Sequence, residues 1–318
     1  MNEKIRWGVL GYAGIAYKHV ISAMVEAKNA VPYAIASRSK EKLMDAKEKF
    51  GFQKTYEDYA SLLQDPDVDA VYIPLPNALH KEWTIKAARA GKHVLCEKPL
   101  ALTEADCLEM IAVCKECGVK LMEAFMYRLT TRTKKLKELL DSGVIGEVMH
   151  INSTQRFLLK DNGNVRVSEA LGGGSLRDVG CYPINIIGMI IKDEPVSFCA
   201  QKVMFQGVDK ALSAVLKYKS GAICTASSGF DACSTLLTEI NGTQGTIIMR
   251  DSFIDTDVPI LLIKDGVTTE VPIQACKRYV LEVEEFSDAV LCDREPALDL
   301  NEVVRNNRLI EKILEVAQ

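Results

Sequence analysis

The sequence predicts an α/β protein in which a doubly wound parallel sheet is followed by an α+β domain with a mostly antiparallel sheet. Its 318 residues indicate two domains, at about 150 residues each. Up to residue 123, short apolar runs alternate with stretches of helical period, which is typical of parallel strands covered by helices. Beyond that residue, β-rich runs separated by turn residues prevail. We therefore predict domains at 1–123 and 124–318.

The first domain is predicted to contain five strands and five helices in alternation. The predicted strands are 5–10, 31–36, 70–73, 93–96 and 120–123. The predicted helices are 15–27, 40–50, 56–63, 79–90 and 104–117. Thr103 is a good cap for the last of these helices, and Gly91 and Gly118 end the helices that they follow.

The second domain combines helices at its ends with strands in its middle. The predicted helices are 134–140, 279–291 and 301–316. The predicted strands are 148–157, 196–205, 211–218, 222–229, 236–240 and 246–249. Turn signals such as Lys219-Ser220-Gly221 and Asn241-Gly242 join successive runs by short connections, which favour antiparallel pairing.

Composition excludes several classes of function. Lys and Arg number 39 against 43 Asp and Glu, so the chain lacks the cationic excess of a general nucleic-acid binder. No apolar run approaches the roughly 18 residues that cross a bilayer. Residues 1–6 are polar and lead directly into an apolar run without the pattern of a secretory signal. We expect a cytoplasmic protein with a small-molecule partner and no membrane association.

Ten cysteines are scattered along the chain, which fits reduced packing thiols better than a disulfide framework. Only Cys114 and Cys117 have the spacing of a metal or redox pair. They fall late in a predicted helix, and no second pair of Cys or His complements them. We assign them to helix packing and expect no metal site.

The first predicted strand runs into a segment where a dinucleotide fold places its pyrophosphate at a helix N-terminus. The residues of this segment are Gly11, Tyr12, Ala13, Gly14, Ile15 and Ala16. Ala13 stands where the usual pattern has its second glycine, so the position between strand and helix carries more weight than the motif. We predict that these six residues bind the cofactor.

The end of the second strand predicts NADP rather than NAD. An NAD-binding fold usually has a carboxylate here, whereas this chain has Ser37 and Arg38. A hydroxyl beside a guanidinium suits a 2′-phosphate, because Arg offers planar, charge-assisted donors. The alternative is a solvated turn with incidental basic residues, with Glu41 as the nearest acidic candidate.

Two further strand ends carry candidate site residues. Lys98 follows Glu97 and precedes Pro99, at the carboxyl edge of the sheet where open α/β folds bind ligands. A partly desolvated lysine has a pKa below about 10.4, which suits it to polarise a hydroxyl or relay its proton, although a surface lysine is the simpler reading. The preceding strand end contributes further predicted cofactor residues: Pro74, Leu75, Asn77 and His80. His80 lines the pocket or merely caps a helix.

Together these residues resemble the glucose-fructose oxidoreductase, inositol dehydrogenase and rhizopine-catabolism family, Gfo/Idh/MocA. The resemblance covers nearly the whole chain and rests on four segments: 8–16, 76–80, 90–99 and 172–182. The Glu-Lys-Pro element at Glu97 and the Asp-x-Gly-x-Tyr element at Asp178, in that order, are its most specific parts. It implies an N-terminal Rossmann domain and a large, open, mostly antiparallel sheet in the C-terminal domain. It also implies a substrate between cofactor and second domain, and a homodimer or homotetramer formed through that sheet.

The resemblance assigns catalytic roles to Lys98, Asp178 and Tyr182. Tyr182 stands where some family members have His, which places this chain with the dihydrodiol-dehydrogenase-like members. Nearness to Lys98 would lower the phenol pKa from about 10 and let Tyr182 exchange a proton near neutrality. Pro183 cannot donate to the carbonyl four residues back, so we expect the helix to kink or to begin late.

Four residues are predicted to contact substrate: Asp178, Tyr182, Arg128 and Arg156. Arg128 binds either a substrate oxygen or an interdomain carboxylate. The polar loop 158–170, which carries Asn162 and Arg166, is either a substrate lid or a flexible connection.

The predicted function is NADP-linked hydride transfer at a hydroxyl or carbonyl carbon of a sugar, cyclitol or vicinal diol. Two alternatives stay open. Relatives of this fold include non-catalytic nucleotide-binding sensors and regulators, against which intact Lys98 and Tyr182 argue. Others use bound NAD transiently during glycoside hydrolysis.

Overall fold

In the computed structural model of this protein, residues 4–161 and 163–318 are described. Residues 1–3 of the polar start and Asn162 of the predicted lid lie outside the described residues. The chain forms two compact units. The first extends to Met126 and also includes Lys277–Val304, and the second comprises Tyr127–Cys276 and Arg305–Gln318. The segment Lys277–Val304 therefore packs within the first unit. The predicted first domain, residues 1–123, does not contain this segment.

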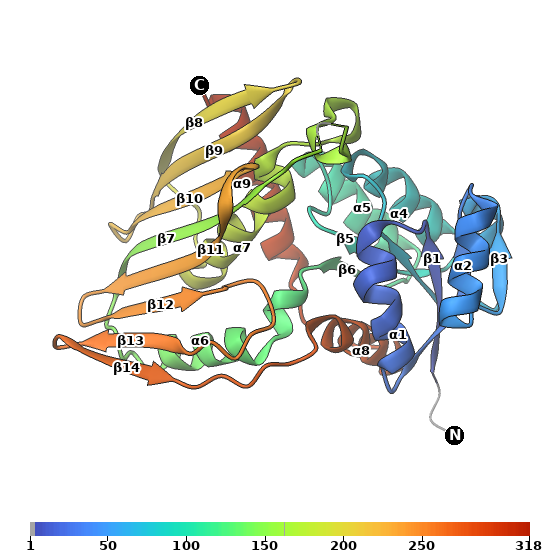
Figure 1. Cartoon of the computed structure of the whole chain (residues 1–318), viewed down its shortest axis with the longest axis horizontal. Coiled ribbons are helices and arrows are strands. Elements are labelled where there is room, and N and C mark those ends of the chain that lie inside the picture. The colour runs from blue at the N-terminus through green and yellow to red at the C-terminus, as the bar shows by residue number, and fades with distance from the viewer. Residues whose placement is uncertain (1–3, 162) are drawn as a thin grey trace. The chain divides into compact units, whose positions relative to one another are not determined.

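The first unit is built on a six-stranded parallel sheet with the order β3-β2-β1-β4-β5-β6 (Figure 1). The strands are β1 (Ile5–Leu10), β2 (Ala30–Ala36), β3 (Lys54–Tyr56), β4 (Ala70–Ile73), β5 (His93–Glu97) and β6 (Leu121–Ala124). Strand order reverses between β1 and β4, and this is the doubly wound arrangement that the sequence predicted.

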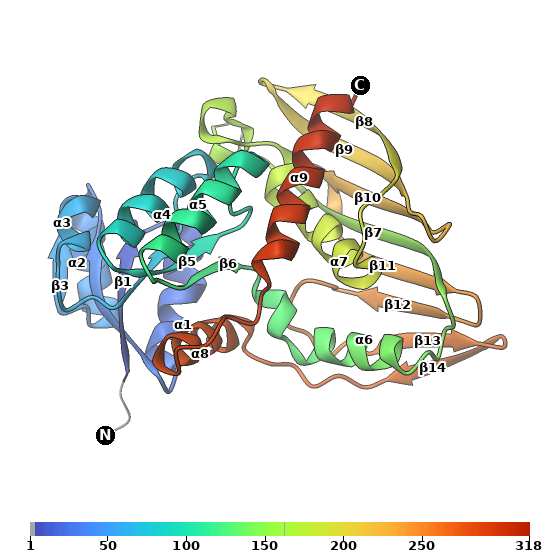
Figure 2. The same ribbon diagram turned by 180° about the vertical axis from the view of Figure 1, so that it is seen from behind.

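Helices cover both faces of this sheet. They are α1 (Ile21–Glu26), α2 (Lys40–Phe50), α3 (Tyr59–Leu63), α4 (His80–Arg89), α5 (Glu104–Glu116) and α8 (Arg278–Leu291). Helices α1 and α8 pack on each other and on one face, whereas α4 and α5 pack together on the other face (Figure 2). The predicted cap of α5 is confirmed, because the Thr103 side chain accepts a hydrogen bond from the Asp106 N–H at 3.1 Å.

The sequence prediction for residues 56–63 was wrong in its first half. Residues Lys54–Tyr56 form the short edge strand β3, and α3 begins only at Tyr59. Asp58 sets this boundary, since its carboxylate accepts a hydrogen bond from the Ser61 N–H at 2.8 Å. A strand of three residues is too short to show an alternating pattern, so β3 was not predicted and its last residue, Tyr56, was assigned to the helix.

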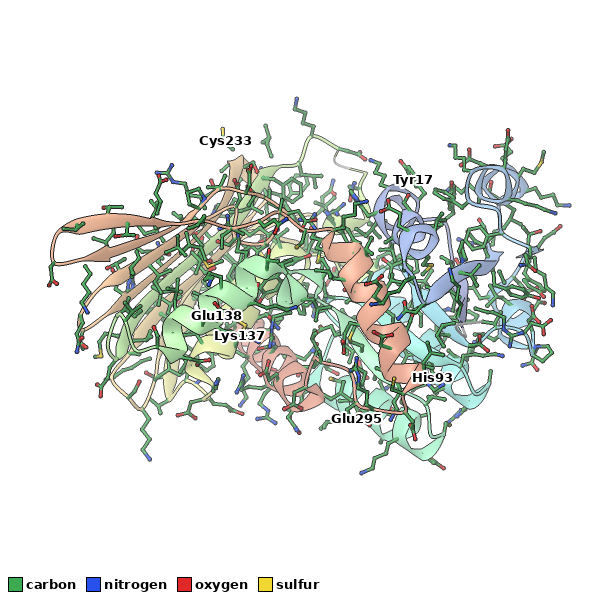
Figure 3. The ribbon with its side chains drawn as sticks, turned by 90° about the horizontal axis from the view of Figure 1, so that it is seen from below. Tyr17, His93, Lys137, Glu138, Cys233 and Glu295 are labelled. Atoms are coloured by element: carbon green, nitrogen blue, oxygen red, sulfur yellow. The ribbon has the colours of Figure 1, made fainter. Side chains whose placement is uncertain are left out.

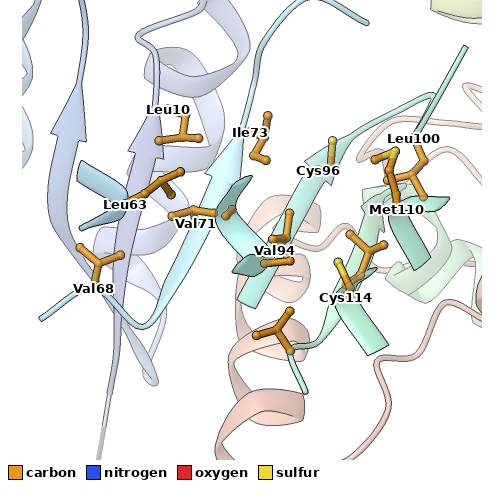
Figure 4. Close-up of a cluster of buried hydrophobic side chains, with 14 of the residues drawn as sticks. Leu10, Leu63, Val68, Val71, Ile73, Val94, Cys96, Leu100, Met110 and Cys114 are labelled. Atoms are coloured by element: carbon orange, nitrogen blue, oxygen red, sulfur yellow. The ribbon is translucent and has the colours of Figure 1, made fainter. Parts of the chain in front are cut away.

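The core beneath α4 and α5 is lined by aliphatic and cysteine side chains (Figure 4). Val94 and Cys96 project from the sheet toward Cys114 and Met110 of α5, and Val71 belongs to the same cluster next to Leu63. All ten cysteines are free thiols. Cys114 is buried and Cys117 is exposed at the end of the helix.

The second unit contains an eight-stranded sheet with the order β14-β13-β12-β11-β7-β10-β9-β8. The strands are β7 (Val148–Leu158), β8 (Ser197–Phe205), β9 (Val208–Lys217), β10 (Ile223–Gly229), β11 (Asp231–Gly242), β12 (Thr246–Arg250), β13 (Ile260–Lys264) and β14 (Val267–Val271). Pairing is antiparallel, as predicted, except between β7 and β10, which run parallel. The segment between these two strands therefore has to cross over, and it carries a helix.

The helices of the second unit lie along one face of its sheet (Figure 2). They are α6 (Thr131–Asp141), α7 (Cys181–Ile191) and the part of α9 (Leu300–Val316) from Arg305 onward. Helix α7 packs on β7 and β10. The end of the chain joins β8, where the Lys202 N–H donates to the Gln318 carbonyl at 2.9 Å. Among the described helices, none is both long enough and apolar enough to span a bilayer.

Trp7 connects α8 to the first strand. Its side chain is fully buried, its Nε1–H donates to Ser287 Oγ at 3.2 Å, and its ring packs on Phe286 with centroids 5.5 Å apart. The segment Lys277–Val304 thus completes the core of the first unit.

We expect Trp7→Ala to lower the free energy of unfolding by about 3–5 kcal/mol, because it leaves a large cavity between β1 and α8. Urea unfolding followed by circular dichroism measures this change. Trp83→Ala is the matched control, since Trp83 is only partly buried. A loss no larger than that of the control would contradict the packing role of Trp7.

Candidate functional site

The turn after β1 requires glycine at its first position. Gly11 has φ of +109°, and a Cβ there would lie 3.3 Å from Leu75 and from Tyr59. Its N–H donates to the Ala36 carbonyl at 2.9 Å, which holds the turn beside β2. Ala16, at the last position of the motif, is completely buried and begins a π-helical turn that leads into α1. A small residue is needed there because helix and strand approach closely.

A hollow of about 280 Å³ lies at the carboxyl ends of β1, β2 and β4. Seven predicted cofactor residues line it: Gly11, Tyr12, Ala13, Ser37, Arg38, Pro74 and Leu75. Gly14 lines an adjoining hollow together with Tyr12 and Ala13. The structure therefore brings together residues that the sequence placed at three separate strand ends.

Lys42 and Tyr59 also line the 280 Å³ hollow, and sequence reasoning missed both. Lys42 lies in the first turn of α2, which Ser39 caps through a hydrogen bond from the Lys42 N–H at 3.3 Å. It stands one helical turn beyond Arg38, and this spacing was the signal that could have identified it. Among the described residues lining this hollow there are two cations and no carboxylate. Glu41 lines only the adjoining hollow.

Lys98 belongs to a segment in which three buried or half-buried side chains fix successive backbone groups. The Lys98 N–H donates to Glu97 Oε2 at 3.3 Å. The Pro99 carbonyl lies 2.9 Å from His80 Nδ1, and the Leu100 N–H donates to Glu123 Oε1 at 2.7 Å. The peptide bond between Lys98 and Pro99 is cis. The backbone that carries Lys98 is thus held from α4, β5 and β6.

Glu97 is tied to the sheet by Tyr72 of β4, whose hydroxyl donates to Glu97 Oε1 at 2.5 Å. Burial raises the pKa of Tyr72 well above its ordinary value, so the phenol stays a donor. Glu282 of α8 is buried nearby, and neither of its carboxyl oxygens has a hydrogen-bond partner. Burial, reinforced by the charge of Glu97, raises the pKa of Glu282 well above its ordinary value.

His80 does not line the hollow. Its ring is completely buried, with Nδ1 directed to the Pro99 carbonyl and Nε2 2.8 Å from the Leu75 carbonyl. It lies between the segment that lines the hollow and the segment that carries Lys98. Asn77 begins a short 3₁₀ turn (Asn77–Leu79) directly before α4.

Asp178 and Tyr182 lie on consecutive turns of different helical type. Asp178 belongs to a π-helical turn (Leu176–Gly180), and α7 begins after it, with Pro183 in its first turn. The predicted late start of this helix is confirmed, since α7 begins only at Cys181. Proline is tolerated in the first turn of a helix because backbone N–H groups there have no intrahelical acceptor. Tyr182 is 5% exposed.

Arg166, from the predicted lid, contacts Asp178. Its Nε–H donates to Asp178 Oδ2 at 2.6 Å. The backbone of this loop packs against the glycine run: the Gly174 N–H donates to the Arg166 carbonyl at 2.8 Å, and a Cβ on Gly173 would lie 2.4 Å from that oxygen. The triple glycine thus allows the loop to approach Asp178.

Of the two arginines that were predicted to contact substrate, Arg128 lies near Tyr182 and Arg156 does not. Arg128 is mostly buried and donates to Asn185 Oδ1, one turn after Tyr182 on α7. Arg156 donates hydrogen bonds to Asp231 and Ser227 on one face of the sheet. Its neighbour Phe157 packs with the cluster that contains Val179, on the opposite face. Successive side chains of a strand point to opposite faces, so Arg156 points away from the turn that carries Asp178.

Within residues 4–161 and 163–318, no group of three or more His, Cys, Asp or Glu side chains is arranged to hold a metal ion. The described geometry of the first unit is that of a dinucleotide-binding oxidoreductase, with a glycine turn, a basic hollow and a lysine at neighbouring strand ends.

Comparison with known proteins identifies the family. Residues 5–125 match the model of an oxidoreductase family with an NAD-binding Rossmann fold, and residues 133–248 match the GFO/IDH/MocA C-terminal domain. The chain belongs to the Gfo/Idh/MocA oxidoreductase family. This confirms the predicted family, fold class and type of reaction.

Individual relatives match over nearly their full length. D-xylose 1-dehydrogenase (NADP(+)) 2 of Haloferax volcanii is 36% identical over 98% of this chain and 97% of its own. A 3-ketoreductase from Actinomadura kijaniata, solved with NADP and TDP-benzene, superposes with a TM-score of 0.94 at 30% identity, covering 99% of this chain and 98% of its own. Trans-1,2-dihydrobenzene-1,2-diol dehydrogenase of Xenopus laevis is 30% identical over 84% of this chain and 81% of its own.

A buried histidine, His80, and a half-buried one, His93, give the stability of the protein a defined pH dependence. Burial lowers the pKa of His80 and of His93, whose Nδ1 accepts a hydrogen bond from the Lys120 N–H at 3.0 Å (His93 is labelled in Figure 3). Below about pH 6.5 the unfolded chain binds protons at these positions before the folded chain does. Acidification therefore favours unfolding.

We expect the thermal unfolding midpoint to be lower at pH 5.5 than at pH 7.5, as measured by circular dichroism. His93→Gln removes one titrating group and keeps a side-chain acceptor, so the difference between the two pH values should be smaller in this variant. Equal unfolding midpoints at both pH values would contradict the attribution of the pH dependence to these histidines. The same difference in the unaltered protein and in His93→Gln would also contradict it.

Proposed function

We propose that this protein is an NADP-linked oxidoreductase that interconverts a hydroxyl and a carbonyl on a sugar, cyclitol or vicinal diol. The observation that carries this proposal is the hollow at the ends of β1, β2 and β4, which unites a glycine turn with Ser37, Arg38 and Lys42. Two cations and a hydroxyl suit a 2′-phosphate, and no described carboxylate lines the hollow to favour an unphosphorylated ribose.

Relatives support both the cofactor and the substrate class. The xylose dehydrogenase is named for NADP(+), and the ketoreductase was solved with NADP. That ketoreductase was also solved as a variant with one lysine replaced and as a variant with one tyrosine replaced. These two positions are 84 residues apart in its chain, which is also the separation of Lys98 and Tyr182 here.

We further propose roles for three side chains in the reaction. NADP supplies the carbon that accepts or donates hydride. In the oxidative direction, Tyr182 takes the proton of the substrate hydroxyl, and in reduction it returns a proton to the carbonyl oxygen. Lys98, on its fixed segment, supplies positive charge that favours the ionised phenol. Asp178, held by Arg166 at 2.6 Å, accepts a hydrogen bond from a substrate hydroxyl.

The division of labour along the chain is part of the proposal. Residues 1–123 bind the cofactor, and residues 124–318 bind the substrate and form a homodimer or homotetramer through the sheet of the second unit. Val203, Val215 and Ile223, on neighbouring strands β8, β9 and β10, support this because they are large apolar residues left exposed. The ten free thiols support cytoplasmic residence.

The cofactor preference depends on Arg38 and Lys42. We expect Arg38→Ala and Lys42→Ala each to weaken NADPH binding about 10–100-fold, because each loses a charge-assisted contact, while NADH binding changes little. Isothermal calorimetry measures both constants. Lys47→Ala, an exposed lysine on the same helix that lines neither hollow, serves as control. Tighter binding of NADH than NADPH by the unaltered protein would refute the NADP assignment.

The proton chemistry depends on Lys98 and Tyr182. We expect Lys98→Met and Tyr182→Phe to reduce kcat on the order of a hundredfold or more, with the Kd for NADPH within a few fold of the unaltered value. Turnover is followed through the absorbance of reduced nicotinamide across a panel of sugars and cyclitols. Tyr218→Phe removes the hydroxyl of another buried tyrosine and controls for packing. Full activity of either variant would exclude its proposed role.

A further inference from the structure

Asn185 occupies a central position next to the proposed acid/base residue. It lies on α7 three residues after Tyr182, so the two side chains are neighbours along one side of the helix. The Asn185 side chain is 1% exposed. No sequence motif singled it out.

The side-chain oxygen of Asn185 accepts two hydrogen bonds from consecutive residues. The Tyr127 hydroxyl donates to Oδ1 at 2.5 Å, and Arg128 Nη1–H donates to the same oxygen at 3.2 Å. Both donors belong to a single 3₁₀ turn (Met126–Leu129), which directly follows β6 in the sequence. One neutral acceptor thus joins this turn to α7.

The bond to Tyr127 bears directly on Tyr182. The Tyr127 ring packs on the Tyr182 ring with centroids 5.8 Å apart, and Phe253 packs on both rings at 5.2 and 5.3 Å. All three side chains are at most 5% exposed. A tyrosine ring enclosed by two aromatic neighbours cannot turn unless one of them moves, and the orientation of Tyr127 is set by its hydroxyl.

We infer that Asn185 is a positioning residue for Tyr182: by fixing Tyr127 and Arg128 against α7, it holds the aromatic cluster that orients the Tyr182 phenol. This inference rests on the proposed function of Tyr182. Asn185 itself contacts neither reacting atom in this account. Its neutrality matters, because it accepts from two donors without placing a negative charge beside a phenol that must ionise.

The primary test is Asn185→Leu, which keeps the approximate volume and removes the acceptor. A displacement of about 1 Å at a reacting group costs roughly a hundredfold in rate, so we expect kcat to fall about 10–100-fold. The pH at which kcat is half-maximal should also shift, whereas the Kd for NADPH stays within twofold. Asn306→Leu, at a similarly buried asparagine of α9, should leave kcat and its pH profile unchanged.

Asn185→Asp provides a conservative rescue with a distinct signature. It keeps both acceptor contacts, so kcat at alkaline pH should recover to within about threefold of the unaltered protein. The added buried charge opposes ionisation of a nearby phenol, so the pH profile should move to higher pH. Recovery of kcat without a shift of the pH profile, or no recovery of kcat at any pH, would contradict the inference.

Tyr127→Phe keeps the ring and removes only its hydroxyl, so it tests the inference even if Asn185→Leu fails to fold. We expect kcat to fall at least threefold. In the double variant with Asn185→Leu, the fold-decrease in kcat should be smaller than the product of the fold-decreases in the two single variants. Unchanged kcat in Tyr127→Phe, or fully multiplicative effects, would overturn the inference. If Tyr182→Phe itself retains full turnover, the proposed function fails instead; if only Tyr182→Phe is impaired, the inference alone fails.

Discussion

The fixed backbone between Glu97 and Leu100 is the constraint on which the placement of Lys98, and with it the proposed proton chemistry, depends. A lysine side chain is long and flexible, so its ammonium is placed reproducibly only if the backbone that carries it cannot shift. Here one carbonyl and two N–H groups are each met by a side chain from a different position in the sheet or its helices. Because two of those partners, His80 and Glu123, are buried, losing either would leave a polar group without compensation.

The second unit achieves a comparable result by a different means. Asp178 is positioned by the close approach of a loop whose backbone packs on glycines, and Tyr182 is positioned by aromatic rings. The buried carboxylate of Asp209 adds support, since it accepts hydrogen bonds from the Ser175 hydroxyl and the Leu176 N–H at the start of the same turn. Burial raises the pKa of Asp209, and these donors oppose that effect.

Much of this arrangement could be predicted from the sequence, because strand ends in a parallel sheet converge at one edge. Gly11, Ser37 and Leu75 are far apart in the chain yet line one hollow, as expected from this rule. The missing N–H of Pro183 led to the expectation that the helix kinks or begins late, whereas the π-helical turn before it was not predicted. Lys42 was missed because a lysine on an amphipathic helix is usually a solvated residue, and its spacing of four residues from Arg38 was the one sequence signal that set it apart.

Other features depend on contacts that local patterns do not encode. His80 was placed at the pocket because it follows a strand end, but its ring turns inward to two carbonyls. The side of β7 on which Arg156 lies depends on strand register, and a shift of one residue would reverse it. Packing of α8 beneath β1 depends on Trp7, some 280 positions away in the chain from Ser287.

The parallel pairing of β7 with β10 has a consequence for how such a protein can diverge. The two strands pair over seven consecutive residue pairs, and the stretch between them first leaves the sheet and then returns to it as β8 and β9, beside β10. Exchange or lengthening of the stretch that follows β7 leaves those pairs intact, yet alters the surroundings of Asp178. Under the proposed role of Asp178, selectivity among alcohols would change by replacement of this segment while the pairing of β7 with β10 stays in place.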